Sequence, residues 1–183
     1  MALDLVEVDK ARFYDAIEMY FLWKELDQRI RTSATRGINF PETISEALAC
    51  YSLGFTWNKG TGGDAVDGNR IIEFKACSNW DLDTTSFSPS EEFDRLYFLR
   101  LDKRNDVLYI YDTGLDSDGL KQIKVNKTET LEDQQKSGRR PRFSVINFII
   151  KPNGIEPVKK VLIREKKVID LWERRKMLFS SFF

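Results

Sequence analysis

Apolar residues in the N-terminal part of the chain recur at helical spacing. Between Asp9 and Arg31 they fall three and four residues apart, and no Gly or Pro interrupts them. This pattern predicts a helix. Phe21 and Leu22 widen the apolar surface beyond one stripe, which is typical of either a subunit interface or burial within the same domain. The residues expected on the buried stripe are Phe13, Ala16, Met19, Tyr20, Trp23, Leu26 and Ile30.

A second helix and two strands are expected next along the chain. Pro41 suits a first helical turn and Gly54 suits a helix end, so we predict a helix from Pro41 to Leu53. A short strand is expected at 55–57, followed by a loop at 58–63. Alternating apolar and charged residues from Asn69 to Cys77 predict the clearest strand of the chain.

The remaining pattern alternates short apolar runs with turns. Residues 89–101 follow a capping-box sequence, which predicts a helix, although the same residues suit a hairpin strand that turns at DKRND. Strands are further predicted at 107–111, 121–127 and 143–150, an irregular loop at 128–142, and a strand followed by a helix at 158–177.

Composition limits the chemistry that this chain can perform. Hydrophobic residues make up 42% and charged residues 32%, as in a globular domain, and 183 residues suffice for one core. Histidine is absent, which excludes a Ser-His-Asp triad, a Cys-His dyad and His-ligated zinc. Cys50 and Cys77 form no CxxC pair and are expected to be buried thiols. Catalysis must therefore use carboxylates and lysine, with or without a hard metal.

Charge is distributed unevenly although the formal net charge is zero. Residues 136–183 carry thirteen Lys or Arg against four Asp or Glu, a net +9, so residues 1–135 carry −9. This asymmetry favours a basic surface for a polyanion beside an acidic region that holds metal. The alternative is that the two parts pair with each other. The acidic N-terminus lacks the features of a signal peptide, which predicts a cytoplasmic protein.

Candidate chemistry lies in the stretch TGGDAVDGNRIIEFKA at 61–76. Glu73 and Lys75 are two residues apart on the predicted strand and so share a face, and the glycine-containing loop can bring Asp64 beside them. Two carboxylates of this kind can bind Mg²⁺, and the lysine can act on a metal-bound water. This is an arrangement for phosphodiester hydrolysis. The alternative is an exposed ion pair on a sheet face, with Asp64 shaping a turn.

Four segments of the chain form a wider pattern around this motif: RGIN at 36–39, LG at 53–54, GGDAVDGNRIIEFK at 62–75 and SNWDLDTTSFS at 78–88. In these segments the chain resembles PvuII-like type II restriction endonucleases of the PD-(D/E)xK superfamily. The resemblance implies an α/β, restriction-endonuclease-like core with a mixed central β-sheet flanked by helices. It also implies a homodimer that cuts both strands of duplex DNA at a short palindrome, using Mg²⁺.

The resemblance also assigns roles to site residues. By position, Asp64 and Glu73 correspond to metal-binding carboxylates and Lys75 to the catalytic lysine. Where the family has a further glutamate this chain has Thr61, which cannot replace a carboxylate. Glu46 on the preceding helix is a candidate for the missing acid. Its alternative is a solvated residue opposite the buried helix face.

DNA-reading residues depart further from the family pattern. A histidine-rich strand is replaced by hydroxyl side chains, and an asparagine pair before a proline is replaced by Arg139 and Arg140. Arginine can donate twice to guanine, which predicts a site rich in G·C pairs. The alternatives are phosphate contacts for the arginines and capping for the hydroxyls. The candidate DNA contacts are Thr84, Thr85, Ser86, Ser88, Ser90, Arg139, Arg140 and Arg142.

We therefore expect one endonuclease domain over 1–183. It would have an N-terminal helical region at 1–35 suited to dimerisation, a catalytic core at 36–155 and a basic extension at 156–183 that tracks phosphates or is simply solvated. The leading hypothesis is a type II restriction endonuclease with a cognate DNA methyltransferase as genetic partner. A structure-directed or repair nuclease on the same core, and a non-catalytic DNA-binding module, are the alternatives.

Overall fold

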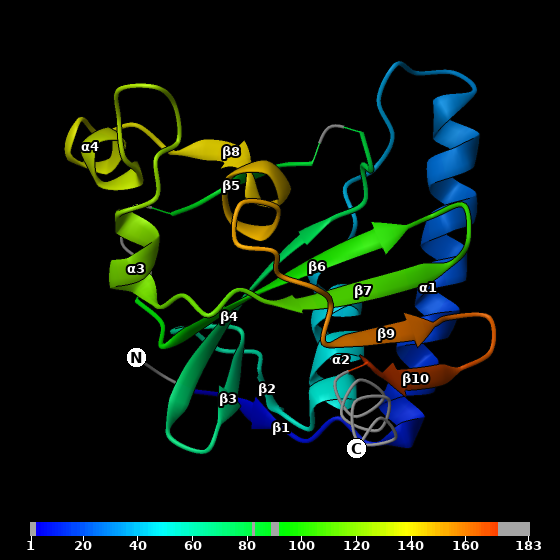
Figure 1. Ribbon diagram of the computed structural model, residues 1–183. Helices are drawn as coiled ribbons and strands as arrows, with labels where there is room; N and C mark the ends of the chain where they lie inside the picture. Colours follow the sequence, from blue (N-terminus) through cyan, green and yellow to red (C-terminus); the bar gives the residue numbers. More distant parts are fainter. Residues whose placement is uncertain (1–2, 82, 89–91, 172–183) are drawn as a thin grey trace, which may run out of the picture.

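A computed structural model describes residues 3–81, 83–88 and 92–171 of the chain. Its centre is an eight-stranded mixed sheet in the order β1-β2-β3-β4-β6-β7-β9-β10, with a separate two-stranded sheet of β5 and β8 (Figure 1). The elements are β1 (Leu5–Val6), α1 (Lys10–Arg31), α2 (Glu42–Leu53), β2 (Thr56–Asn58), β3 (Ala65–Asp67), β4 (Arg70–Cys77), β5 (Thr84–Ser86), β6 (Arg95–Asp102), β7 (Val107–Asp112), α3 (Ser117–Lys121), α4 (Leu131–Lys136), β8 (Arg142–Ser144), the π-helix η1 (Ile146–Ile150), β9 (Lys159–Leu162) and β10 (Lys167–Asp170).

The two predicted N-terminal helices are confirmed and cover one face of the sheet. The Asp9 side chain caps α1 by accepting from the Arg12 amide at 2.9 Å. Gly54 ends α2 in the left-handed conformation, with a φ of 75°. Phe13, Tyr20 and the buried face of α2 pack against this side of the sheet.

A second hydrophobic core lies on the opposite face. Strand β6 contributes to both cores because its side chains alternate: Tyr97 and Leu99 join the core under α1 and α2, whereas Leu96 and Phe98 join the other. The second core is closed by α3, α4 and η1, which lie on the left and in front of the sheet in Figure 1. The expected mixed sheet flanked by helices is thus confirmed.

Both strands of the smaller sheet belong to connections that leave the large one. Strands β4 and β6 pair in parallel, and β5 lies within the crossover between them. Strand β8 lies within the connection between the antiparallel neighbours β7 and β9. The β5–β8 pair is therefore built from two connections between strands of the large sheet, which pair with each other as a separate sheet.

Several predicted elements in the second half of the chain are wrong. The helix predicted for residues 89–101 is not formed over the described residues 92–101, and the hairpin alternative holds, because residues 95–102 form the strand β6. This central strand buries side chains on both of its faces. Residues 121–127 form no strand but the end of α3 and turns. The predicted loop 128–142 contains α4, which the capping box of Thr130 and Asp133 begins. Of the predicted strand 143–150, only the first two residues lie in β8, and η1 follows.

The outer face of α1 carries an apolar stripe of Met19, Leu22 and Leu26, which are 39%, 68% and 51% exposed. Leu22 was expected only to widen the apolar surface, whereas Met19 and Leu26 were predicted on the buried stripe, and that prediction is wrong. Ile17 and Asp27 take their place on the buried face. None of the helices in the described ranges has the length and apolar character of a membrane span.

Candidate active site

The loop before β3 brings the carboxylate of Asp64 against β4. The Asp64 amide donates to the Ile72 carbonyl at 2.8 Å. Asp64 Oδ2 in turn accepts from the Phe74 amide at 2.7 Å. Because Phe74 stands between Glu73 and Lys75 in β4, this bond places the Asp64 carboxylate beside the E-x-K pair. The three residues that the motif singled out are brought together.

Gly63 permits this close approach of loop and strand. Its φ is +89°, a conformation that side-chain-bearing residues rarely adopt. A Cβ on Gly63 would clash with the Ile71 side chain and would lie 3.1 Å from the Ile72 carbonyl oxygen. The glycine therefore fixes how near Asp64 can come to β4.

Glu73 and Lys75 share one face of β4 and form an ion pair. Glu73 is only 3% exposed, so the pair is not the exposed surface pair considered as an alternative. The Lys75 ammonium also lies 5.9 Å from the centre of the buried Phe87 ring. In such a water-poor setting, charges act more strongly on one another and on a ligand than they would in bulk solvent.

Glu46 reaches the same site from α2 and is half-buried. Burial, with a smaller contribution from the Asp64 carboxylate, raises the pKa of Glu46 to about 7. The indole N–H of Trp57 donates to Glu46 Oε2 at 2.8 Å and acts in the opposite direction, as does the charge of Lys75. The pKa of Glu46 thus depends on the charges of two motif residues, Asp64 and Lys75. The contact with Trp57 was not foreseen, because nothing in an eleven-residue separation signals it.

The donor set at this site suits a hard cation. Asp64, Glu73 and Glu46 offer oxygen atoms only, which Mg²⁺ prefers. Across 3–81, 83–88 and 92–171, no group of three or more His, Cys, Asp or Glu is gathered so as to hold a metal ion. These carboxylates therefore form no ready-made cage, and a cation held by them would keep several water ligands.

The two segments expected to read DNA pair with each other as β5 and β8. Ser86 stands opposite Arg142, and Thr85 stands opposite Phe143. Thr85 and Phe143 are buried, whereas Thr84 and Arg142 are exposed and Ser86 is half-buried. The outward face of the pair therefore offers two hydroxyls and a guanidinium, while Thr85 faces the protein interior.

The other candidate contacts flank this pair. Ser88 is half-buried, and Arg140 and Arg142 are exposed. Neither of these two arginines forms a side-chain hydrogen bond or ion pair with the part of the chain that the structure describes. Arg139 instead pairs with Glu129. That contact is the main reason why the pKa of Glu129 is lowered to about 2, and hydrogen bonds from two amide side chains add to the effect.

The basic C-terminal segment begins as the hairpin β9–β10 at the edge of the sheet, and several of its charges have partners. Lys159 Nζ lies 2.7 Å from Asp170 Oδ2, and Arg164 Nε lies 2.5 Å from Asp106 Oδ2. The predicted strand is confirmed as β9. The strand β10 then pairs with it, where a helix was expected. Other basic or polar candidates lie outside the described residues: Ser90, Arg174, Arg175 and Lys176.

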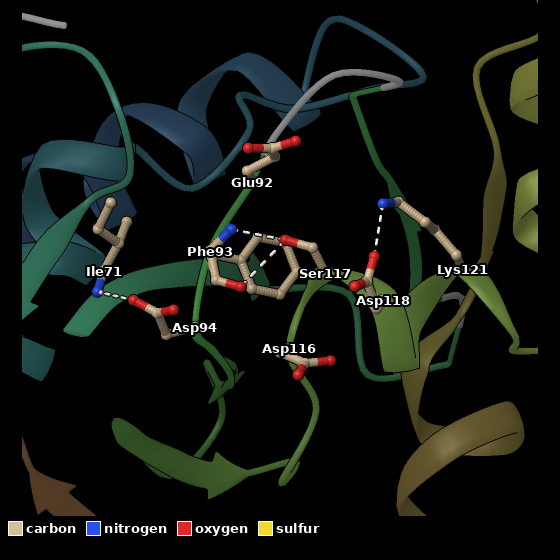
Figure 2. Close-up of a pocket in the computed structure, with 8 residues that line it drawn as sticks. All are labelled: Ile71, Glu92, Phe93, Asp94, Asp116, Ser117, Asp118 and Lys121. Atoms are coloured by element: carbon tan, nitrogen blue, oxygen red, sulfur yellow. Dashed lines mark hydrogen bonds and ion pairs between the residues drawn. The ribbon is translucent and has the colours of Figure 1, made fainter.

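A cavity of about 370 Å³ opens at another place, beside the first residues of β4 and β6. Figure 2 shows that two of its acidic side chains have partners within the protein: the Asp94 carboxylate accepts from the Ile71 amide at 2.7 Å, and Asp118 contacts Lys121 at 2.7 Å. A third, Asp116, caps α3. Neither Asp64 nor the E-x-K pair lines this cavity.

Comparison with known proteins gives a consistent result. The family model described as Bsp6I restriction endonuclease matches residues 8–152. The type II restriction enzyme Bsp6I of Bacillus sp. (strain RFL6) is 66% identical over 174 residues, which cover 93% of this chain and 100% of that protein. No solved structure matches the chain. The range matched by the family model includes Glu46, the Asp64 motif and both strands of the β5–β8 pair.

Proposed function

The chain belongs to the Bsp6I restriction endonuclease family, and we propose from this premise that it cuts both strands of duplex DNA at a short, GC-rich palindrome with Mg²⁺. The expectation of a type II restriction endonuclease, a site-specific deoxyribonuclease, is confirmed by this membership. The metal, the character of the site and the assembly are parts of the proposal.

One observation supports the catalytic assignment above others. Asp64 Oδ2 is held at 2.7 Å by the amide of Phe74, the residue that separates Glu73 from Lys75. A carboxylate, a buried second carboxylate and an ammonium group thereby converge beside β4, a central strand of the large sheet. This is the set of charges that hydrolysis of a phosphodiester requires.

Each residue then has a separate role. Asp64 and Glu73 would hold Mg²⁺, with Glu46 as a further carboxylate from α2. When bound, the ion lowers the pKa of a water ligand and offsets negative charge on the phosphate. Lys75 orients the attacking water and stabilises the charge that develops on the phosphoryl oxygens. The water oxygen forms the new bond to phosphorus and the P–O3′ bond breaks, which leaves 5′-phosphate and 3′-hydroxyl ends.

Recognition is assigned to the outward face of the β5–β8 pair and its flanks. Arg140 and Arg142 are exposed, and a guanidinium can donate twice to guanine O6 and N7 in the major groove. Thr84 and Ser86 lie beside Arg142 and can accept or donate to either base type. These properties support a site rich in G·C pairs.

A homodimer is the assembly that suits a palindrome, because two-fold related subunits read two identical half-sites. The exposed stripe of α1 formed by Met19, Leu22 and Leu26 is the surface we assign to the second copy. A DNA methyltransferase of the same specificity is the expected genetic partner, since unmodified sites in the host would otherwise be cut. The cytoplasm, where that DNA lies, is the proposed compartment.

Incubation with phage DNA and Mg²⁺ tests the proposal, with discrete fragments as the expected product. Asp64→Asn and Lys75→Ala should each lower the cleavage rate by at least about 100-fold. Binding of the same DNA at saturating Ca²⁺ should persist in both variants. Asp67→Asn is a matched control, because Asp67 lies in the same DAVD sequence but pairs with Arg70 at the surface.

The other outcomes separate the alternatives. A smear, or nicking at branched sites only, would favour a nuclease directed by DNA shape. Intact DNA would favour a binding module without catalytic activity. Cleavage by either Asp64→Asn or Lys75→Ala at the parental rate would remove the assignment of the site.

A further inference from the structure

Trp57 contacts two of the segments that carry carboxylates assigned to the metal. Its indole Nε1 donates to Glu46 Oε2 at 2.8 Å. Its backbone pairs in the β2–β3 ladder with Ala65, the residue that follows Asp64. One residue of β2 therefore contacts the carboxylate from α2 through its side chain and the segment bearing Asp64 through its main chain.

We propose that Trp57 is a positioning residue of the metal site, whose indole N–H fixes the Glu46 carboxylate relative to Asp64. The role rests on the function proposed above, because Glu46 needs a fixed position only if it serves the metal. Groups that orient a metal ligand from behind commonly change metal affinity by about 10–100-fold when they are removed.

The strand that carries Trp57 is itself held firmly. Asn58 is buried, and its side chain accepts from the Asp4 amide at 2.9 Å and donates to the Gly63 carbonyl at 2.9 Å. The Asn58 amide also donates to the Asp64 carbonyl at 2.9 Å. The loop 59–63 is thereby tied back to β2 at both of its ends. A group attached to β2 has a fixed position with respect to Asp64.

The chemistry of an indole suits this task. The Trp57 ring is half-buried and packs against the core beneath α1 and α2, so its N–H points in one direction. The hydrogen bond engages Oε2 and leaves Glu46 Oε1 for a cation. A neutral donor also stabilises the charged carboxylate without adding a positive charge that would repel a metal ion.

The test measures how much Ca²⁺ is needed for binding a fluorescent duplex that carries the mapped cleavage site. Trp57→Phe keeps a ring in the same place but removes the donor. Its half-saturating Ca²⁺ concentration should rise by about 10-fold or more. The double variant Trp57→Phe/Glu46→Gln should match Glu46→Gln alone, because a residue that acts only through Glu46 has no effect once that carboxylate is gone.

Trp23→Phe is the matched control. Trp23 Nε1 also donates to a protein oxygen, the Asn39 carbonyl at 3.0 Å, and the residue contacts none of the motif residues. It should lower the unfolding temperature without changing the Ca²⁺ requirement. Should Trp57→Phe fold poorly, β-(3-benzothienyl)alanine at position 57 keeps the shape of the indole and replaces its N–H by sulfur. The same rise in Ca²⁺ requirement is expected from it.

Two results would overturn the role of Trp57. The first is a parental Ca²⁺ requirement in both donor-less variants. The second is a double variant whose defect is the product of the two single defects, which would show that Trp57 and Glu46 act independently. Either result, obtained while Asp64→Asn still abolishes cleavage, would leave the proposed function intact and remove only the positioning role.

Discussion

The site formed by Asp64, Glu73 and Lys75, here called the motif site, differs from the β5–β8 pair in how its charges are arranged. At the motif site Glu73 is buried in an ion pair with Lys75, and Asp64 is held by a backbone amide. In the β5–β8 pair and its flank, the Arg140 and Arg142 side chains are exposed and form no hydrogen bond or ion pair with the described residues. The polar groups of the first region bond to one another, whereas the arginines of the second are available to a ligand.

This difference follows from what each region has to do. Reacting groups must be held in place before the substrate arrives, since small displacements lower rates steeply. Groups that read bases need exposed donors whose partners are supplied by DNA. The topology separates the two regions: the E-x-K pair lies on β4 and Asp64 on the loop that leads into β3, whereas β5 and β8 lie in connections that leave the large sheet.

The largest expected effect comes from a substitution at Gly63 that moves the Asp64 loop away from β4. Gly63→Ala places a methyl group against Ile71 and the Ile72 carbonyl at a φ of +89°. The loop must then move away from β4 and take the Asp64 carboxylate with it. We expect cleavage to fall by about 100-fold or more, measured as initial rate on a plasmid with one site.

Gly68→Ala is the control for that change. Gly68 also has a positive φ, +61°, but a Cβ there meets nothing within 4 Å. It should cost roughly 1 kcal/mol of stability through backbone strain alone and leave the rate per folded molecule unchanged. Equal losses of activity in both variants would mean that the loop is merely strained and that the approach of Asp64 to β4 is unimportant.

A carboxylate remote from both regions sharpens the comparison, because its burial serves the fold alone. Burial opposes ionisation of Asp106, but hydrogen bonds from Lys24 and Tyr20 outweigh it and lower the pKa of Asp106 below 3.8. Its φ of 54° suits asparagine, so Asp106→Asn removes the charge without backbone strain. We expect a loss of roughly 3 kcal/mol at neutral pH, because Lys24 and Arg164 lose a buried partner.

The pH dependence of stability tests the same residue. A carboxyl group whose pKa is lower in the folded than in the unfolded state stabilises the fold above about pH 4, and this contribution is lost as the pH falls through the folded value. The parental unfolding temperature should therefore drop between about pH 5 and pH 2 more steeply than that of Asp106→Asn. Parallel curves would contradict the assigned pKa direction.

The elements around Asp64, Glu73 and Lys75 could largely be predicted from sequence, because residues close together in the chain determine them. The period of α1, the stop at Gly54 and the alternation along β4 are each set by residues close in the chain. A two-residue spacing fixes that Glu73 and Lys75 share a face of any strand. What could not be predicted depends on contacts distant in sequence, such as the bond between Trp57 and Glu46.

The failures have physical causes of the same kind. Residues 95–102 have an apolar content compatible with helix or strand, and only their position between β4 and β7 decides for a strand buried on both faces. Residues 143–150 have high strand propensity, yet their burial in the second core as η1 overrides it. Leu22 and Leu26 were read as part of an apolar surface whose direction relative to the sheet no local pattern specifies.

The smallest expected effect concerns Arg139, the arginine that departs from the rule of exposed, unpaired donors. Glu129→Gln removes the anionic partner of Arg139 and one negative charge near bound phosphates. An exposed ion pair contributes little, so DNA binding in Ca²⁺ should tighten by only a few-fold, measured by fluorescence anisotropy. Glu132→Gln, whose partner is Lys136 at 2.9 Å, is the control for the charge change alone. Equal gains from the two variants would show that only net charge matters, and that Arg139 does not exchange Glu129 for DNA.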